Sequence, residues 1–107
     1  MQLSELLSPD CTKCAVEGAS KKRLLETISQ IVAPKLSGIT RHDIFESLLN
    51  RERLGSTGIG LGIAIPHGRL PNANHPVAVL LTLDEPIEFD SIDNQPVDII
   101  FALLVPE

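Results

Sequence analysis

The chain is divided by one segment, Gly55-Ser-Thr-Gly-Ile-Gly-Leu-Gly-Ile-Ala-Ile-Pro-His67-Gly68, which separates a helical pattern from a series of short apolar runs. Five of the seven glycines of the chain lie within it. Because glycine adopts positive φ readily and lets the backbone approach a ligand closely, this density is typical of a binding site and not of a core. His67 is the one ionisable side chain of the segment.

Two amphipathic helices are predicted before this segment. Ser20 suits the N-cap of the first, and its apolar residues recur at helical spacing: Leu24, Leu25, Ile28, Ile31 and Val32. Pro34 limits this helix, although the pattern could continue to Leu36 with a kink. Thr40 and Asp43 predict a capping box for the second helix. That helix ends near Arg53 or Leu54, with Gly55 as its stop.

Strands are predicted after the second helix, at Gly62–Ile65, Val77–Leu83 and Val97–Val105. The last two runs are apolar at nearly every position, so we expect a sheet covered on both faces, for which two helices are too little. Residues 1–19 read as an apolar start followed by a polar connector. Helices first and strands afterwards predict an α/β sandwich-like domain, with a mixed β-sheet flanked by helices, over residues 1–107.

Composition excludes several classes of function. The 107 residues suit one domain, with 43% hydrophobic and 21% charged residues. A net charge of −5 argues against nucleic acid as a partner. The N-terminus lacks the basic and apolar regions of a secretory signal, so we expect a cytoplasmic protein. The longest apolar run, Ile99 to Val105, is far shorter than the ~20 residues that span a bilayer, so no membrane segment is predicted.

Cys11 and Cys14 form a Cys-x-x-Cys pair, which fits either a redox pair or half of a zinc site. The chain has no second such pair and no His-x3–5-His to complete four ligands. We therefore favour two reduced thiols without a functional role.

The glycine-rich segment does not match the common nucleotide-binding motifs. No lysine follows its glycines as a Walker motif requires, and Ile63 stands where a Rossmann motif has its third glycine. What remains is a run of backbone amides that can form an anion-binding nest, with the hydroxyls of Ser56 and Thr57 as further donors. Pro66 and Gly68 would present the His67 imidazole at a strand end. The pattern alone also fits a plain turn beside an exposed histidine.

Three motifs carry a resemblance to a known family. They are Arg51-Glu-Arg-Leu-Gly-Ser-Thr-Gly-Ile-Gly-x-Gly-Ile-Ala-Ile-Pro-His67-Gly68, Phe89-Asp-x-Ile-Asp-Asn-Gln-Pro-Val-Asp-Ile-Ile-Phe-Ala-Leu-Leu-Val-Pro106 and Ser20-Lys-Lys-Arg23. The first resembles the active-site signature of the fructose/mannitol-type (type 2) enzyme IIA domains of the bacterial phosphoenolpyruvate-dependent phosphotransferase system. The second is similar to the nitrogen-regulatory branch of that family. The resemblance implies the α/β fold of those IIA domains.

The resemblance also implies site residues and partners. His67 would accept a phosphoryl group, as a tele-phosphohistidine, from an HPr-like carrier (NPr in the nitrogen branch) charged by enzyme I. Arg51 matches the active-site arginine, with Arg53 as its nearby competitor, and would bind phosphate oxygens. The loop residues that would line the phosphate site are Ser56, Thr57, Gly58 and Gly68. No cofactor or metal is implied, and the regulated partners would be proteins such as transporters or sensor kinases.

The remaining titratable residues are predicted to lie outside the site. His42 and His75 read as solvated surface histidines. The aspartates that could suggest a metal cluster serve turns and solvent: Asp90, Asp93 and Asp98.

Three functional hypotheses follow: a regulatory phosphotransfer protein, which we favour, a sugar-specific IIA component that passes phosphate to a IIB domain, and a binding module that is never phosphorylated. The family domain continues beyond Glu107, with further helices and a second active-site histidine. We therefore expect a domain without its C-terminal helices, and extra exposed apolar surface on Val97–Val105.

Overall fold

The structure, a computed structural model, describes residues 12–16 and 20–106; the apolar start of the sequence and Cys11 lie outside them. The helical elements are α2 (Lys21–Val32), the short 3₁₀ helix η2 (Ala33–Lys35) and α3 (Arg41–Leu54). The strands are β1 (Thr12–Val16), β2 (Gly58–Gly60), β3 (Ile63–Ala64), β4 (His67–Leu70), β5 (Val77–Ile87) and β6 (Val97–Pro106).

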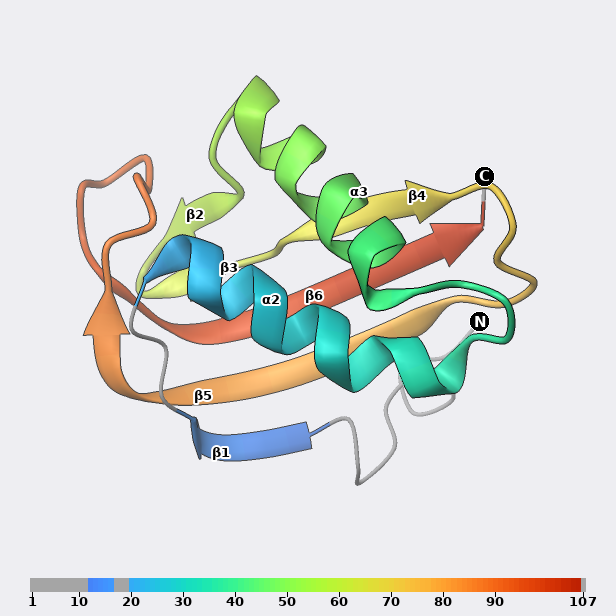
Figure 1. Cartoon of the computed structure of the whole chain (residues 1–107). Coiled ribbons are helices and arrows are strands. Elements are labelled where there is room, and N and C mark those ends of the chain that lie inside the picture. Colours follow the sequence, from blue (N-terminus) through green and yellow to red (C-terminus); the bar gives the residue numbers. More distant parts are fainter. Residues whose placement is uncertain (1–11, 17–19, 107) are drawn as a thin grey trace.

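The described strands form one mixed sheet in the order β1-β5-β6-β3-β2, with β4 also paired to β6. Strands β5 and β6 run antiparallel, whereas β3 and β4 lie in succession along β6, parallel to it. Helices α2 and α3 lie over the same face of this sheet (Figure 1). The predicted fold class, an α/β domain with a mixed sheet and packed helices, is confirmed.

The predicted helix ends are confirmed in detail. The Ser20 side chain accepts the backbone N–H of Arg23, and the helix ends at Val32, after which Pro34 lies in the 3₁₀ turn. Thr40 and Asp43 form the reciprocal capping box of α3. These caps depend on contacts within four residues, so the local sequence determines them.

Three strands were missed by the sequence reading. β1 lies in the stretch predicted to be a polar connector, where it pairs in parallel with β5. β2 consists of Gly-Ile-Gly and β4 of His-Gly-Arg-Leu, compositions with low β-propensity. β1 and β4 form because the longer apolar strands β5 and β6 supply hydrogen-bond partners, and β2 pairs with β3, which is itself paired to β6. The tertiary pairing, and not local propensity, therefore decides these elements.

The core lies between the helices and the facing side of the sheet. Its members from the helices include Leu24, Leu25, Ile28, Ile44 and Leu48, all fully buried. On β6 the side chains alternate from Ile100 to Leu104, with Ile100, Ala102 and Leu104 buried, and Val97 at the start of the strand is buried as well. On the same strand Ile99 is 38% exposed, while Phe101 and Leu103 are partly buried.

Candidate functional site

His67 is the first residue of β4 and so stands at a strand end, but Gly68 continues this strand, which corrects the prediction that Gly68 turns the chain away. The strand begins here because the Pro66 carbonyl accepts the N–H of Leu103 at 2.9 Å, which places His67 opposite Leu103 on β6. The imidazole is partly buried. The backbone of the histidine is therefore fixed by the sheet and not by a loop.

Gly68 is required because β4 lies very close to α3. A Cβ atom added at this position would lie 2.2 Å from Ser47 Oγ and 3.3 Å from the backbone carbon of Ser47. The Ser47 hydroxyl donates to the carbonyl of Arg69 at 3.0 Å, which ties the helix to the strand at this point. The absence of a side chain at Gly68 thus brings the His67 imidazole within reach of α3.

Both ring nitrogens of His67 have hydrogen-bond partners. Arg51 Nε donates to His67 Nε2 at 3.1 Å, and His67 Nδ1 lies 2.9 Å from the carbonyl oxygen of Ile65. Because a carbonyl only accepts and a guanidinium only donates, these partners select the neutral tautomer with its proton on Nδ1. The lone pair lies on Nε2, which is the nitrogen of a tele-phosphohistidine.

Arg51 is itself held at a second point, since its Nη1 donates to the carbonyl of Gly55 at 2.9 Å. Its competitor Arg53 is directed elsewhere, with Nη1 on the side chain of Asn50 at 3.3 Å. Of the two arginines named by the sequence reading, the structure brings Arg51 and not Arg53 to His67.

A cavity of about 340 Å³ opens beside the pair. Its lining comes from one face of the last turns of α3 and from the start of β4: Ser47, Asn50, Arg51, Leu54, His67, Gly68 and Arg69. The exposed Arg69 adds a second guanidinium to this cavity, which favours an anionic ligand.

The sequence reading missed Ser47, Asn50 and Arg69 as lining residues. Their spacing carries the information: Ser47 and Asn50 share a helix face with Arg51, and Arg69 follows His67 by two residues on one strand.

The predicted loop residues Ser56, Thr57 and Gly58 do not line this cavity. The Ser56 hydroxyl donates to the carbonyl of Phe89, and the Thr57 hydroxyl donates to Glu52. The N–H of Thr57 also donates to Glu52, at 3.1 Å. Gly58 lies against Ser91, where an added Cβ would come 2.3 Å from the hydroxyl. A direct phosphate contact by this loop therefore remains a prediction.

Other candidates named from the sequence lie apart from the site. His42 and His75 are exposed, as expected for surface histidines, and Cys14 is an exposed free thiol. Within residues 12–16 and 20–106, no three His, Cys, Asp or Glu side chains gather in a way that could hold a metal ion. In the same ranges, no helix is long and apolar enough to cross a membrane.

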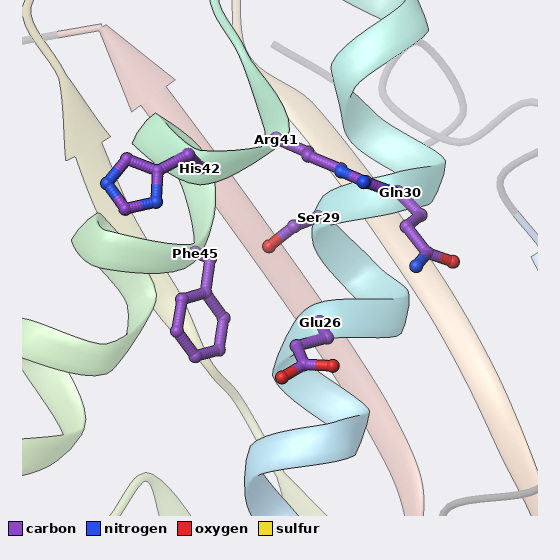
Figure 2. Close-up of a pocket in the computed structure, with 6 residues that line it drawn as sticks. All are labelled: Glu26, Ser29, Gln30, Arg41, His42 and Phe45. Atoms are coloured by element: carbon purple, nitrogen blue, oxygen red, sulfur yellow. The ribbon is translucent and has the colours of Figure 1, made fainter.

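A second cavity, of about 270 Å³, lies between α2 and α3 (Figure 2). Its polar side chains do not converge: Arg41 extends toward Gln30, whereas the His42 ring points to the opposite side (Figure 2). We assign it no ligand.

The fold and the arginine–histidine pair define an α/β domain that presents one neutral imidazole nitrogen beside a guanidinium, a suitable arrangement for an anionic group. Comparison with known proteins then places the chain. Residues 5–107 match the family described as "Phosphoenolpyruvate-dependent sugar phosphotransferase system, EIIA 2", and the chain belongs to this family. The predicted family is thereby confirmed.

Several relatives of the chain are nitrogen regulatory proteins. The chain is 53% identical over 107 residues to the "Nitrogen regulatory protein" of Klebsiella oxytoca, covering 99% of this chain and 65% of that protein. The crystal structure of nitrogen regulatory protein IIA-Ntr from Neisseria meningitidis matches with a TM-score of 0.92 and 42% identity, over 96% of this chain and 70% of that one. The chain thus spans about two thirds of the length of these relatives.

The IIA mannitol protein of Escherichia coli shares the fold alone. Its crystal structure matches with a TM-score of 0.80 at 16% identity, over 94% of this chain and 72% of that one. The common architecture therefore extends beyond close relatives in sequence.

Proposed function

We propose that this chain accepts a phosphoryl group on His67 from an HPr-like carrier, NPr in the nitrogen branch, which enzyme I charges from phosphoenolpyruvate in the cytoplasm. The phosphorylation state then alters binding to regulated proteins such as transporters or sensor kinases. Family membership and the identity to nitrogen regulatory proteins support this proposal. The observation that carries it is the pair of contacts on the imidazole, which leaves the lone pair on Nε2.

The proposed step is a direct exchange of one phosphorus–nitrogen bond for another. The Nε2 lone pair attacks the phosphorus of the carrier's phosphohistidine and forms the new P–N bond. The P–N bond to the carrier breaks, and its electron pair returns to the carrier's imidazole. Nδ1 keeps its proton throughout, and its donation to the Ile65 carbonyl stabilises the positive charge that the His67 ring gains.

Arg51 has two roles in this scheme. Before transfer it donates to Nε2 and fixes the plane of the ring. As the phosphoryl group arrives, the guanidinium moves from Nε2 to the phosphoryl oxygens, while Nη1 keeps its contact with Gly55. Since phosphoryl transfer depends on positioning and on donors for the spread negative charge, one such arginine contributes strongly to the rate.

The test is incubation with phosphoenolpyruvate, enzyme I and NPr or HPr, followed by intact mass measurement. We expect a single phosphate-sized gain in the wild type that is lost in acid and persists in base, as a phosphoramidate requires. His67→Ala should show no gain, whereas the matched controls His42→Ala and His75→Ala should gain phosphate like the wild type. A gain in His67→Ala would overturn the assignment, and no gain in the wild type would favour a binding module.

Addition of a purified sugar-specific IIB domain distinguishes the second hypothesis, a IIA component of a sugar transporter. The family description names a sugar phosphotransferase system, and this is the observation that favours the alternative. We expect the phosphorylated chain to retain its phosphate in the presence of the IIB domain. Rapid transfer to the IIB cysteine would favour the sugar-specific function instead.

A further inference from the structure

Glu52 is a buried carboxylate that the proposed phosphoryl transfer does not use. Its side chain is 4% exposed, although it stands in the last turn of α3 next to Arg51. A buried charge is costly unless it has partners, so its position calls for a role. Its partners are Thr57, which donates both its N–H and its hydroxyl to Oε1, and Lys21, whose Nζ lies 2.7 Å from Oε2.

One series of hydrogen bonds leads from Glu52 to the Nδ1 side of His67. Oε1 of Glu52 fixes Thr57, whose carbonyl accepts the N–H of Ile65 at 2.9 Å. The carbonyl of Ile65 in turn lies 2.9 Å from His67 Nδ1. The direction of the Ile65 carbonyl, which selects the tautomer, thus depends on where Thr57 is held.

A second series leads from the same residue to the Nε2 side. The Glu52 carbonyl accepts the N–H of Gly55 at 3.1 Å, and its side chain holds Thr57 two residues further on. Gly55 is therefore held on both sides, by its own N–H bond to the Glu52 carbonyl and by Thr57, which the Glu52 side chain holds two residues further on. Its carbonyl anchors Arg51 Nη1, and Arg51 Nε reaches His67 Nε2.

Lys21 supplies a positive charge next to the buried Glu52 carboxylate. Lys21 is the first residue of α2, so the ion pair joins the start of α2 to the end of α3. The Lys21 ammonium also lies 4.7 Å from the centre of the Phe89 ring and 3.5 Å from Asp90. The start of α2, the end of α3 and the loop at Thr57 therefore meet at the Glu52 carboxylate.

We infer that Glu52 is a positioning residue for His67: as an acceptor for Thr57, it holds both Arg51 on Nε2 and the Ile65 carbonyl on Nδ1. The expected effect on the rate of phosphoryl uptake rests on the proposed function, whereas the expected effect on the tautomer of the ring does not. It predicts that loss of the acceptor at position 52 loosens both contacts of the imidazole while His67 itself is unchanged.

The experiment compares two double variants that carry the same charge and differ in the acceptor. Lys21→Met with Glu52→Gln keeps an amide oxygen for Thr57, whereas Lys21→Met with Glu52→Met offers none. The readout is the pair of imidazole ¹⁵N resonances of His67, which are far apart when one tautomer dominates and converge when both are populated. Phosphoryl uptake from NPr is measured on the same samples.

We expect the Gln variant to keep separate ¹⁵N resonances and an uptake rate within about threefold of the wild type. In the Met variant the resonances should converge, and uptake should fall at least about tenfold. Glu26→Gln, which removes the partner of Arg23 on α2, should leave both readouts unchanged. A folded Met variant with wild-type resonances and uptake would overturn the inference.

Thr57→Val provides the second measurement if the Met variant does not fold. It removes the hydroxyl bond to Glu52 and keeps the backbone bond, so a smaller convergence of the resonances is expected. Unchanged resonances in Thr57→Val would then overturn the inference. If the wild type takes up no phosphate, the proposed function fails, while the ¹⁵N comparison still decides the role of Glu52.

Discussion

The two parts of the glycine-rich segment share a composition but differ in where their polar groups point. In residues 55–62 these groups are hydrogen-bonded to other residues of the protein: Ser56 to Phe89, Thr57 to Glu52 and the N–H of Leu61 to Asp93. In residues 63–68 the backbone pairs with β6, and one side chain, His67, faces the cavity. The glycines mark places where the backbone packs closely against other residues, such as Ser91 and Ser47. The candidate ligand site lies beside these places.

Arg51→Ala tests the second part and should have the largest effect. If the guanidinium binds the transferring phosphoryl group, uptake from NPr should fall ~10²–10³-fold, equivalent to about 2.7–4 kcal/mol of transition-state stabilisation. Arg53→Ala is the matched control from the same helix turn and should change uptake less than threefold. Equal losses in the two variants would show that the cavity needs only general positive charge, and that the Nε–Nε2 contact is unimportant.

Gly68→Ala tests the close approach of β4 to α3. The new Cβ would clash with Ser47, including its backbone carbon, so the strand must shift. We expect a loss of about 1–3 kcal/mol in the free energy of unfolding, measured by urea denaturation. Ser47→Gly in the same chain should recover part of this loss. A variant as stable as the wild type would mean that β4 and α3 are less tightly packed than the distances indicate.

Ser56→Ala tests the first part. Because the hydroxyl binds the carbonyl of Phe89, its removal should cost about 1 kcal/mol of stability and leave phosphoryl uptake within about threefold. Urea denaturation and the uptake assay check the two expectations on the same sample. The opposite result, unchanged stability with a loss of uptake near that of Arg51→Ala, would support a direct phosphate contact by the loop.

The fold could be predicted where the determining contacts are local. The caps at Ser20 and Thr40 involve residues three apart, and the long apolar runs that form β5 and β6 are visible without any partner. β1 and β4 could not be predicted, because they pair with strands tens of residues away. β2 pairs with the nearby β3, which is itself held in the sheet by the distant β6. A strand such as Gly58–Gly60 has no preference of its own for the sheet.

For the candidate site, the sequence could name two side chains but not the residues that hold them in place. His67 and Arg51 could be named from the family resemblance, and the structure brings the two side chains into contact. Glu52 and Arg69 were not found, since one acts through backbone groups of other residues and the other depends on an unpredicted strand. The direction of the Ser56 and Thr57 hydroxyls depends on Phe89 and Glu52, which no local pattern places there.

Leu61→Asn examines strain in the first part of the segment. Leu61 has φ of 58° and is 90% exposed, so its side chain gains little from burial. The other described non-glycine residues with positive φ are Asp90 and Asn94, types that tolerate this conformation. Since the left-handed region costs most residues about 1–2 kcal/mol, Asn at position 61 should stabilise the protein by about 0.5–1 kcal/mol.

Urea denaturation measures this gain, and Ile59→Asn is the control, because Ile59 is exposed but lies in β2 without positive φ. The control should show no gain. If both substitutions stabilise equally, the effect comes from removing exposed apolar surface and not from the backbone.

Asp93 gives the smallest effect and a dependence on pH. Backbone hydrogen bonds from Leu61 and Gln95 hold the pKa of this exposed carboxyl below its usual value of 3.8. A group whose pKa is lower in the folded state binds its proton more readily in the unfolded state. Its stabilisation is therefore complete above pH 3.8 and is lost as the pH falls through the folded-state pKa.

The difference in unfolding free energy between wild type and Asp93→Asn should consequently shrink on acidification from about pH 6 to about pH 2.5. Glu88→Gln removes an equal charge from the same connection and serves as the reference for the general effect of charge. Denaturation series at each pH would show the contrast. A constant difference for Asp93→Asn would mean that the Leu61 turn is held by its glycines alone, and that the carboxylate does not tie it to the β5–β6 connection.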